Sequence, residues 1–133
     1  MFDALKISAT GLGAETVRID VVANNLANQN TMLTPGGGPY QSEFVQLLSL
    51  PANSQGVGQG VEVGGIYNQA TPTVTVYDPT SPYANAKGQV LYPNVSVSTQ
   101  MVDMIQAESA YQANANAFTA ESSTYVKALS LGA

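Results

Sequence analysis

The chain has 133 residues, with 4 Lys+Arg against 9 Asp+Glu, a net charge of −5 and only 10% charged residues, where about 25% is usual. It contains no Cys, His or Trp, which excludes Cys/His zinc sites, cysteine nucleophiles and histidine bases. Four cations are also too few to form a surface for nucleic acid or anionic lipid.

Residues 1–30 contain no proline and repeat apolar or small side chains every seven residues, which predicts a helix over 3–28 of about 39 Å. Gly11 and Gly13 lie inside this stretch, and each costs about 1 kcal/mol of helix stability relative to Ala. Asn24, Asn25 and Asn28 mark its end, because Asn competes for backbone hydrogen bonds and tolerates left-handed conformations. The predicted a/d seam consists of Phe2, Leu5, Ala9, Leu12, Ile19, Ala23 and Leu26.

Residues 31–94 hold all seven prolines and most of the glycines, and the runs between them look extended. The predicted strands are Tyr40–Leu48, Val61–Tyr67, Val74–Tyr77 and Gln89–Tyr92. Four short strands over some 60 residues can form only a small β unit with little core.

Residues 95–133 return to a proline-free helical pattern, which predicts a helix over 97–130 of about 51 Å. Gly132 follows as a C-cap. Alanines fill many of the remaining positions and permit close helix packing. The predicted seam of this helix consists of Val97, Met101, Met104, Tyr111, Phe118, Tyr125 and Leu129.

We therefore predict a mainly α, α+β fold, in which residues 1–30 and 95–133 pair as one coiled-coil domain. Residues 31–94 form a loop and a small β-rich segment, which we expect at one end of the helix pair. Two interpretations stay open for the outer helix faces. They belong either to a helical hairpin packed on a sheet within one chain, or to contacts with other copies and subunits. The low charge content favours assembly.

Chemical motifs are weak throughout the chain. The glycines at 36–38 precede Pro39 and no Gly-Lys-Ser/Thr follows, so they are not a phosphate loop. Asp78 before Pro79 indicates a turn. Glu108 falls on the aromatic seam, where it is either solvated at the rim or paired with Lys6 or Arg18. We predict no catalytic residue, metal or cofactor, no cleavable signal, no membrane insertion and no small-molecule substrate.

Two segments carry a resemblance to a known family. VVANNLANQNT at 21–31 resembles the Asn-rich end of the first helix in axial proteins of the bacterial flagellum, the rod and hook family. The segment 77–123, with YDP, ANAKGQVLYPNV, MVDMI and AYQANANAF, is similar to the proximal rod members of that family. The matching motif residues are Asn24, Asn25, Asn28, Tyr77, Asp78, Pro79, Pro93 and Asn94.

The resemblance implies a structural, non-enzymatic subunit of the basal-body rod, which polymerises through its terminal helices into the drive shaft between motor and hook. It implies export by the flagellar type III apparatus without a cleaved signal, and a place in the periplasm-spanning rod. The implied partners are other copies, the proximal and distal rod proteins, the export apparatus and the surrounding rings. The loop 34–41 lacks the basic residue that relatives often carry there, so contacts of that loop are not transferred.

Two rival functions compete with this one. The chain could be a different rod or hook-junction subunit, against which the YDP and GQVLYPNV segments argue, or a small soluble enzyme or binding module built on scattered carboxylates and tyrosines. For the rod subunit, we expect the termini to be largely disordered before assembly, since the two glycines and the scarcity of charge pairs weaken the isolated helices.

Overall fold

The computed structural model describes the backbone of residues 2–132 and the side chains from Asp3 onward, so the side chain of the predicted seam residue Phe2 lies outside the described residues. Two long helices dominate, α1 (Phe2–Ala27) and α2 (Val97–Leu131). Both predicted helices are confirmed, and their ends lie within one residue of the predicted ones. The predicted combination of terminal helices with a small central β region is also confirmed.

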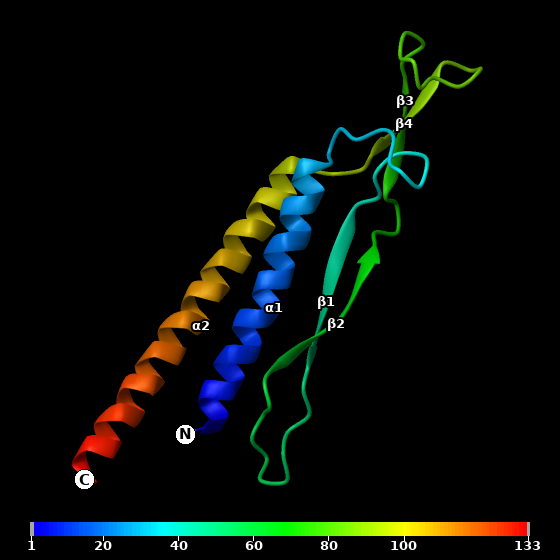
Figure 1. The fold of residues 1–133 in the computed structure, drawn as a ribbon. Helices are drawn as coiled ribbons and strands as arrows, with labels where there is room; N and C mark the ends of the chain where they lie inside the picture. The colour runs from blue at the N-terminus through cyan, green and yellow to red at the C-terminus, as the bar shows by residue number, and fades with distance from the viewer. Residues whose placement is uncertain (1, 133) are drawn as a thin grey trace.

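The two helices lie side by side and run antiparallel (Figure 1). Asn25 near the end of α1 bonds Gln100 near the start of α2, and Gly11 faces Asn114 further along. At this register the first residue of α1 lies opposite residue 123. Because α2 has 35 residues and α1 has 26, residues 124–131 of α2 extend about 12 Å beyond the end of α1. We call this segment the α2 overhang.

The four predicted strands are found as β1 (Glu43–Ser49), β2 (Val61–Asn68), β3 (Thr73–Tyr77) and β4 (Gln89–Pro93). The predicted start of the first strand at Tyr40 is wrong, since β1 begins three residues later. The strands form two separate antiparallel pairs, β1–β2 and β3–β4. The register of β1–β2 shifts between Gln46 and Leu47, which leaves Gly64 as the extra residue of a bulge in β2.

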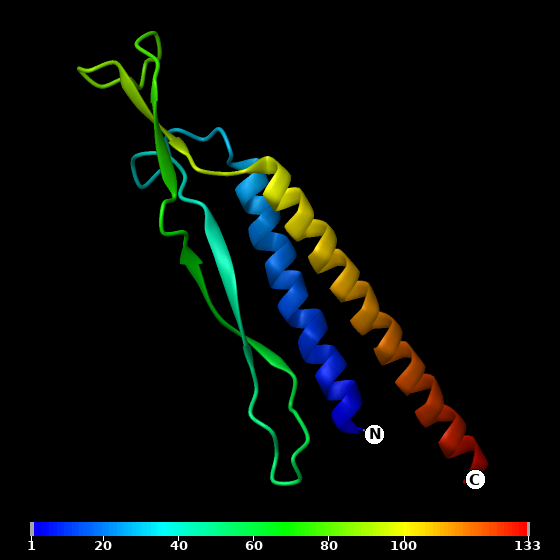
Figure 2. The ribbon, with the colours of Figure 1, turned by 180° about the vertical axis from the view of Figure 1, so that it is seen from behind.

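Only part of the β region lies where the sequence led us to expect it. The β3–β4 hairpin projects beyond the end of the helix pair, whereas β1–β2 lies along the length of α1 (Figures 1 and 2). Among the described helices and strands, β3 and β4 contact only each other. The expectation of one β unit at the end of the helices is thus wrong for β1–β2, because Val61 bonds Thr10 in α1 and ties that hairpin to the helix.

The buried apolar core is small for a chain of this length. Among the described residues it consists of Ala14, Val21, Val22, Val90 and Ala107. Large apolar side chains such as Ile105 and Phe118 remain exposed. Neither described helix is long and apolar enough to cross a membrane. Several large apolar side chains of the helices are therefore not covered within the single chain.

Both ends of α2 are capped in the usual way. Ser96 is the N-cap, and its hydroxyl accepts a hydrogen bond from the Thr99 backbone N–H at 3.4 Å. Gly132 is the C-cap, as predicted, and its N–H donates to the carbonyl of Leu129. Gly132 has a right-handed φ of −99°, so it ends the helix without the left-handed turn that glycine often supplies there.

Candidate functional site

The contact between α1 and α2 is built from small and polar residues, which we call the helix contact row. On α2 it includes Gln100, Ala107 and Asn114, which recur every seven residues. Ala107 is completely buried. On α1, Gly11 lies so close to Asn114 that an added Cβ would come within 2.7 Å of its amide nitrogen. Close packing of this kind requires glycine and alanine, and it leaves little room for large apolar residues between the helices.

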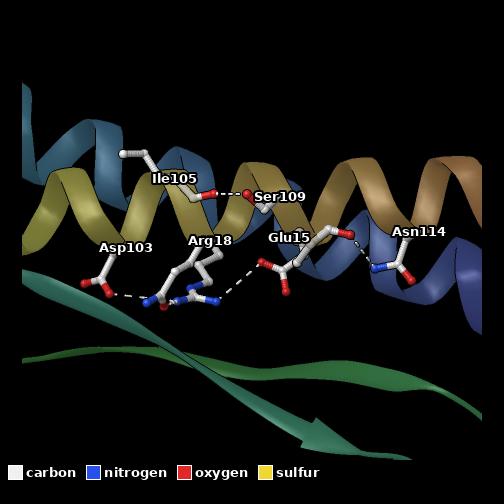
Figure 3. Close-up of polar contacts among 8 residues, drawn as sticks. Glu15, Arg18, Asp103, Ile105, Ser109 and Asn114 are labelled. Carbon is white, nitrogen blue, oxygen red and sulfur yellow. Dashed lines mark hydrogen bonds and ion pairs between the residues drawn. The ribbon is translucent and has the colours of Figure 1, made fainter.

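Arg18 supplies the charged part of the helix contact row (Figure 3). Its guanidinium lies 3.6 Å from Glu15 on the same helix and 3.9 Å from Asp103 on α2. It also donates to Gln106 Oε1 at 3.5 Å. These long, partly exposed contacts contribute little free energy each. They fix which turn of α2 stands opposite Arg18, and thereby the register of the pair.

Asn25 is the polar centre that joins α1 to the rest of the molecule. It is 1% exposed, and its Nδ2 donates to the Glu43 carbonyl at 2.8 Å and to Gln100 Oε1 at 2.9 Å. Its Oδ1 accepts from the Glu43 N–H and from the Tyr40 hydroxyl, each at 2.9 Å. All four bonding positions of the amide are therefore filled. One side chain thus fastens the end of α1 to β1 and to the start of α2.

Tyr40 lies beside this amide and also accepts a bond from Asn24 Nδ2 at 3.2 Å. Burial, and to a smaller extent the nearby Glu43 carboxylate, raises the pKa of the Tyr40 phenol. The phenol therefore stays neutral and keeps donating to Asn25 at physiological pH.

The remaining Asn residues of the motif close the turn after α1. Asn28 Nδ2 donates to the carbonyl and to the side-chain oxygen of Asn24, and Thr31 donates to Asn28 Oδ1. No described residue other than glycine has a positive φ. The Asn residues therefore do not use the left-handed conformation that this residue type tolerates. These residues end the helix through their side-chain hydrogen bonds instead.

The other motif residues lie in and around the β3–β4 hairpin. Asp78 Oδ1 accepts from the backbone and hydroxyl of Thr80, which confirms the turn predicted at Asp78 and Pro79. Tyr77 is 73% exposed. Asn94, after the buried Pro93, donates to the Thr71 carbonyl at 2.8 Å.

Ser42 completes this junction between the two hairpins. It is fully buried and donates to the Asn94 carbonyl at 3.3 Å, while its own carbonyl accepts from the Gln69 N–H. The residues before β1, between β2 and β3, and after β4 are thus tied together by hydrogen bonds. The motif around Asn94 places the outer hairpin relative to the helices.

The predicted seam of α1 lies on the side of the helix away from the β1–β2 hairpin, beside the row that faces α2. Gly11, Arg18 and Asn25 face α2, and Thr10, one residue before Gly11, bonds β2. Successive residues of a helix are about 100° apart around its axis. Leu12 follows Thr10 by two residues, so Leu12 and its heptad repeats point to the side opposite the hairpin. The members of that row are half-buried: Leu5, Leu12, Ile19 and Leu26. Ala9 and Ala23 are exposed.

The predicted seam of α2 points to the same side. Asp103 lies on the side of α2 that faces β1, where both line one cleft. Met101 and Met104 lie on the other side of the row that contains Gln100. Met101 is 55% exposed and Leu129 is 57% exposed. Of the rest, Met104 and Tyr125 are half-buried, and three are exposed: Val97, Tyr111 and Phe118. We call this combined surface of both helices, opposite β1–β2, the seam face.

Glu108 lies on this side and is exposed. The alternative of a bond to Lys6 or Arg18 is wrong within one chain, because Arg18 pairs with Glu15 and Asp103. Lys6 instead bonds Gln59, in the loop before β2. Within residues 2–132 no group of three acidic side chains is placed to hold a metal ion. The notable surface of the described chain is therefore an apolar one.

Sequence reasoning missed the helix contact row, although its signal was present. Gln100, Ala107 and Asn114 recur every seven residues as regularly as the apolar rows do. A search for apolar heptads passes over such a row, because polar and small residues score as surface. Tyr40 and Ser42 carried no signal, since their role depends on long-range partners.

Comparison with known proteins gives a consistent result over the whole chain. Residues 86–131 match the family model described as flagellar basal body rod FlgEFG protein C-terminal, and residues 5–32 match that of flagella basal body rod protein. Flagellar basal-body rod protein FlgC of Bacillus subtilis is 38% identical, covering 98% of this chain and 97% of the relative. The FlgC proteins of Borreliella burgdorferi and Salmonella typhimurium are each 35% identical, with at least 97% of each chain covered.

Proposed function

The chain belongs to the FlgC family of flagellar basal-body rod proteins, and from this premise we propose how it assembles. It is a structural subunit of the proximal rod in the flagellar basal body, and it assembles with other rod components into the shaft that carries motor torque. We propose that the seam face is the surface through which the terminal helices join neighbouring subunits, and that the subunit performs no catalysis.

The observation that carries this assignment is the direction of the apolar rows. Leu12 and Met104 and their repeats share one side of the helix pair, while the helix contact row between α1 and α2 is small and polar. A free subunit gains nothing from an apolar surface that its own helices leave uncovered. Packing that surface against neighbours buries the apolar area that the chain itself does not bury.

The finer parts of the function follow from the same proposal. We propose that the partners are further copies and the other proximal and distal rod proteins, within the surrounding rings. We also propose that the chain reaches the periplasm-spanning rod through the flagellar type III apparatus with its N-terminus uncleaved. The helix pair of residues 1–30 and 95–133 would form the inner part of the rod, and residues 31–94 its outer part.

The test places a charge on the seam face. Leu12→Asp and Tyr111→Asp, expressed in a strain that lacks its own copy, should abolish incorporation into basal bodies and motility, because a buried unpaired carboxylate is strongly unfavourable. Ala113→Asp is the matched control, since Ala113 is exposed and points about 200° away from Tyr111. Normal swimming of either seam variant would show that the seam face is assigned wrongly.

A further inference from the structure

A cleft opens beside α1 on the side of the β1–β2 hairpin, away from the seam face. It has a volume of about 290 Å³. Val21 and Val22 of α1 form its floor, with Val45 and Leu47 of β1 on one side. Gln100 and Asp103 of α2 form the other side. The cleft is thus lined by apolar residues of α1 and β1 and by polar residues of α2, and it is of a size that takes one or two side chains.

The charges around this cleft are predominantly negative. Glu43 and Asp103 line it together with one cation, Arg18. That cation is already shared between Glu15 and Asp103. An apolar lining that includes two carboxylates suits a side chain with an aliphatic stem and a positive end. Lysine and arginine are the residues of that kind.

The α2 overhang offers such a side chain at the other end of the molecule. Lys127 is the only residue of the overhang that is charged at neutral pH, and no described residue pairs with the Lys127 ammonium. Val126 and Leu129 beside it are 60% and 57% exposed. An exposed cation flanked by exposed apolar residues is complementary to the cleft in both charge and polarity.

The other lysines fit the cleft less well. Lys6 donates to Gln59 within the chain. Lys87 lies in the loop before Gly88, next to Asn85 and Ala86, and has no large apolar neighbour in sequence. Of the described cations outside the cleft, Lys127 alone combines a free ammonium with apolar surroundings.

Cleft and overhang cannot meet within one copy. Lys127 follows Asp103 by 24 residues of continuous helix, which separates them by about 36 Å. A contact between them joins one copy to the next, and two different surfaces that meet in this way produce an open-ended array. Resting on the proposed function, we propose that the cleft receives the α2 overhang of a second copy, with Lys127 between Glu43 and Asp103.

The test is disulfide trapping, for which the chain offers a clean background because it contains no cysteine. Val126→Cys in the overhang and Gln69→Cys in the cleft wall are combined in one full-length chain, expressed in cells that lack the native copy. Isolated basal bodies are then oxidised. We expect a ladder of cross-linked products at multiples of the chain mass, beginning at twice that mass. Val126→Cys with Glu62→Cys is the control, since Glu62 is exposed on the same hairpin outside the cleft.

The charge requirement is tested in the same assay. Lys127→Glu should lower the yield of cross-linked product about tenfold, and Glu43→Lys in the same chain should restore it, since the reversed pair attracts again. A yield that is insensitive to Lys127→Glu overturns the proposal.

The remaining outcomes separate this inference from the proposed function. If the chain is present in basal bodies but gives no product, or gives as much with the Glu62→Cys control, the docking contact is refuted and the rod function stands. A product with a different protein refutes the second copy as the occupant. If the chain without substitutions is absent from basal bodies, the proposed function is refuted, and so is this inference.

Discussion

The two glycines of α1 should respond oppositely to the same substitution. Gly13 has nothing within 4 Å of the position that a Cβ would take, whereas a Cβ at Gly11 would lie 2.7 Å from Asn114 Nδ2 and 2.8 Å from its Cγ. Both sites gain about 1 kcal/mol of helix propensity on substitution by Ala. Only at Gly11 does that gain compete with a clash.

The free-energy cost of a Cβ at Gly11 comes from the interactions that Asn114 loses when it moves aside. Its side chain donates to the Ala110 carbonyl at 3.0 Å, and losing that bond costs about 1 kcal/mol. Overpacking a close contact costs typically about 1–3 kcal/mol. We therefore expect Gly11→Ala to lose about 1–3 kcal/mol of unfolding free energy after the propensity gain is subtracted, and Gly13→Ala to gain about 1 kcal/mol.

The assay is urea unfolding followed by far-ultraviolet circular dichroism, with sucrose present to favour the paired helices. A second variant isolates the clash. In the Asn114→Ala background, Gly11→Ala should become stabilising, because the side chain that it meets is gone. Equal effects of Gly11→Ala and Gly13→Ala would refute the reasoning, since both would then report helix propensity alone and no contact with Asn114.

Three further predictions concern the buried polar centre and the free chain. Asn25→Leu should lower the free energy of unfolding by about 3 kcal/mol or more in the same assay, because it leaves Gln100 and the Glu43 N–H without their hydrogen-bond partner. An unchanged unfolding midpoint would contradict the role of Asn25. Tyr40 should ionise above the ordinary tyrosine pKa when followed by ultraviolet absorbance, with Tyr40→Phe identifying its signal. Because folding raises the pKa of Tyr40, the stability that its neutral phenol contributes is fully present below about pH 10, the ordinary tyrosine pKa. That contribution is lost as the pH rises through the pKa of Tyr40 in the folded chain. In amide exchange, α1 and α2 should be weakly protected in the free chain and strongly protected in the rod; full protection in the free chain would rule out folding on assembly.

Sequence periodicity was sufficient to predict the helices and strands. The seven-residue repeats identified α1 and α2 to within a residue at each end, because a helix keeps its period over many turns. Extended runs bounded by glycine and proline residues identified the four strands. The division into two hairpins was not predictable, since it depends on Ser42 and Asn94, whose hydrogen bonds join segments far apart in the chain.

The site was only half predictable for a related reason. An apolar heptad shows that a helix has a face to bury, but it does not show against what. Leu12 and Tyr111 were assigned to repeating apolar rows, and the structure places another row, with Gly11 and Ala107, between the two helices. Choosing between these rows needs the register, which is set by contacts such as that between Asn25 and Gln100.

The arrangement explains why a chain with so few charges keeps polar residues between its own helices. If the apolar rows faced each other, the subunit would be a stable hairpin, and its outer surface would have little with which to bind neighbours. With Gln100, Asn114 and Arg18 inside, the pair holds one register but gains little stability from it. In the proposed assembly, the apolar rows stay available and the free energy that fixes the helices is released mainly when subunits join. Strong contacts between subunits with weak contacts within them are what a shaft under torsion requires, because its load passes from one subunit to the next.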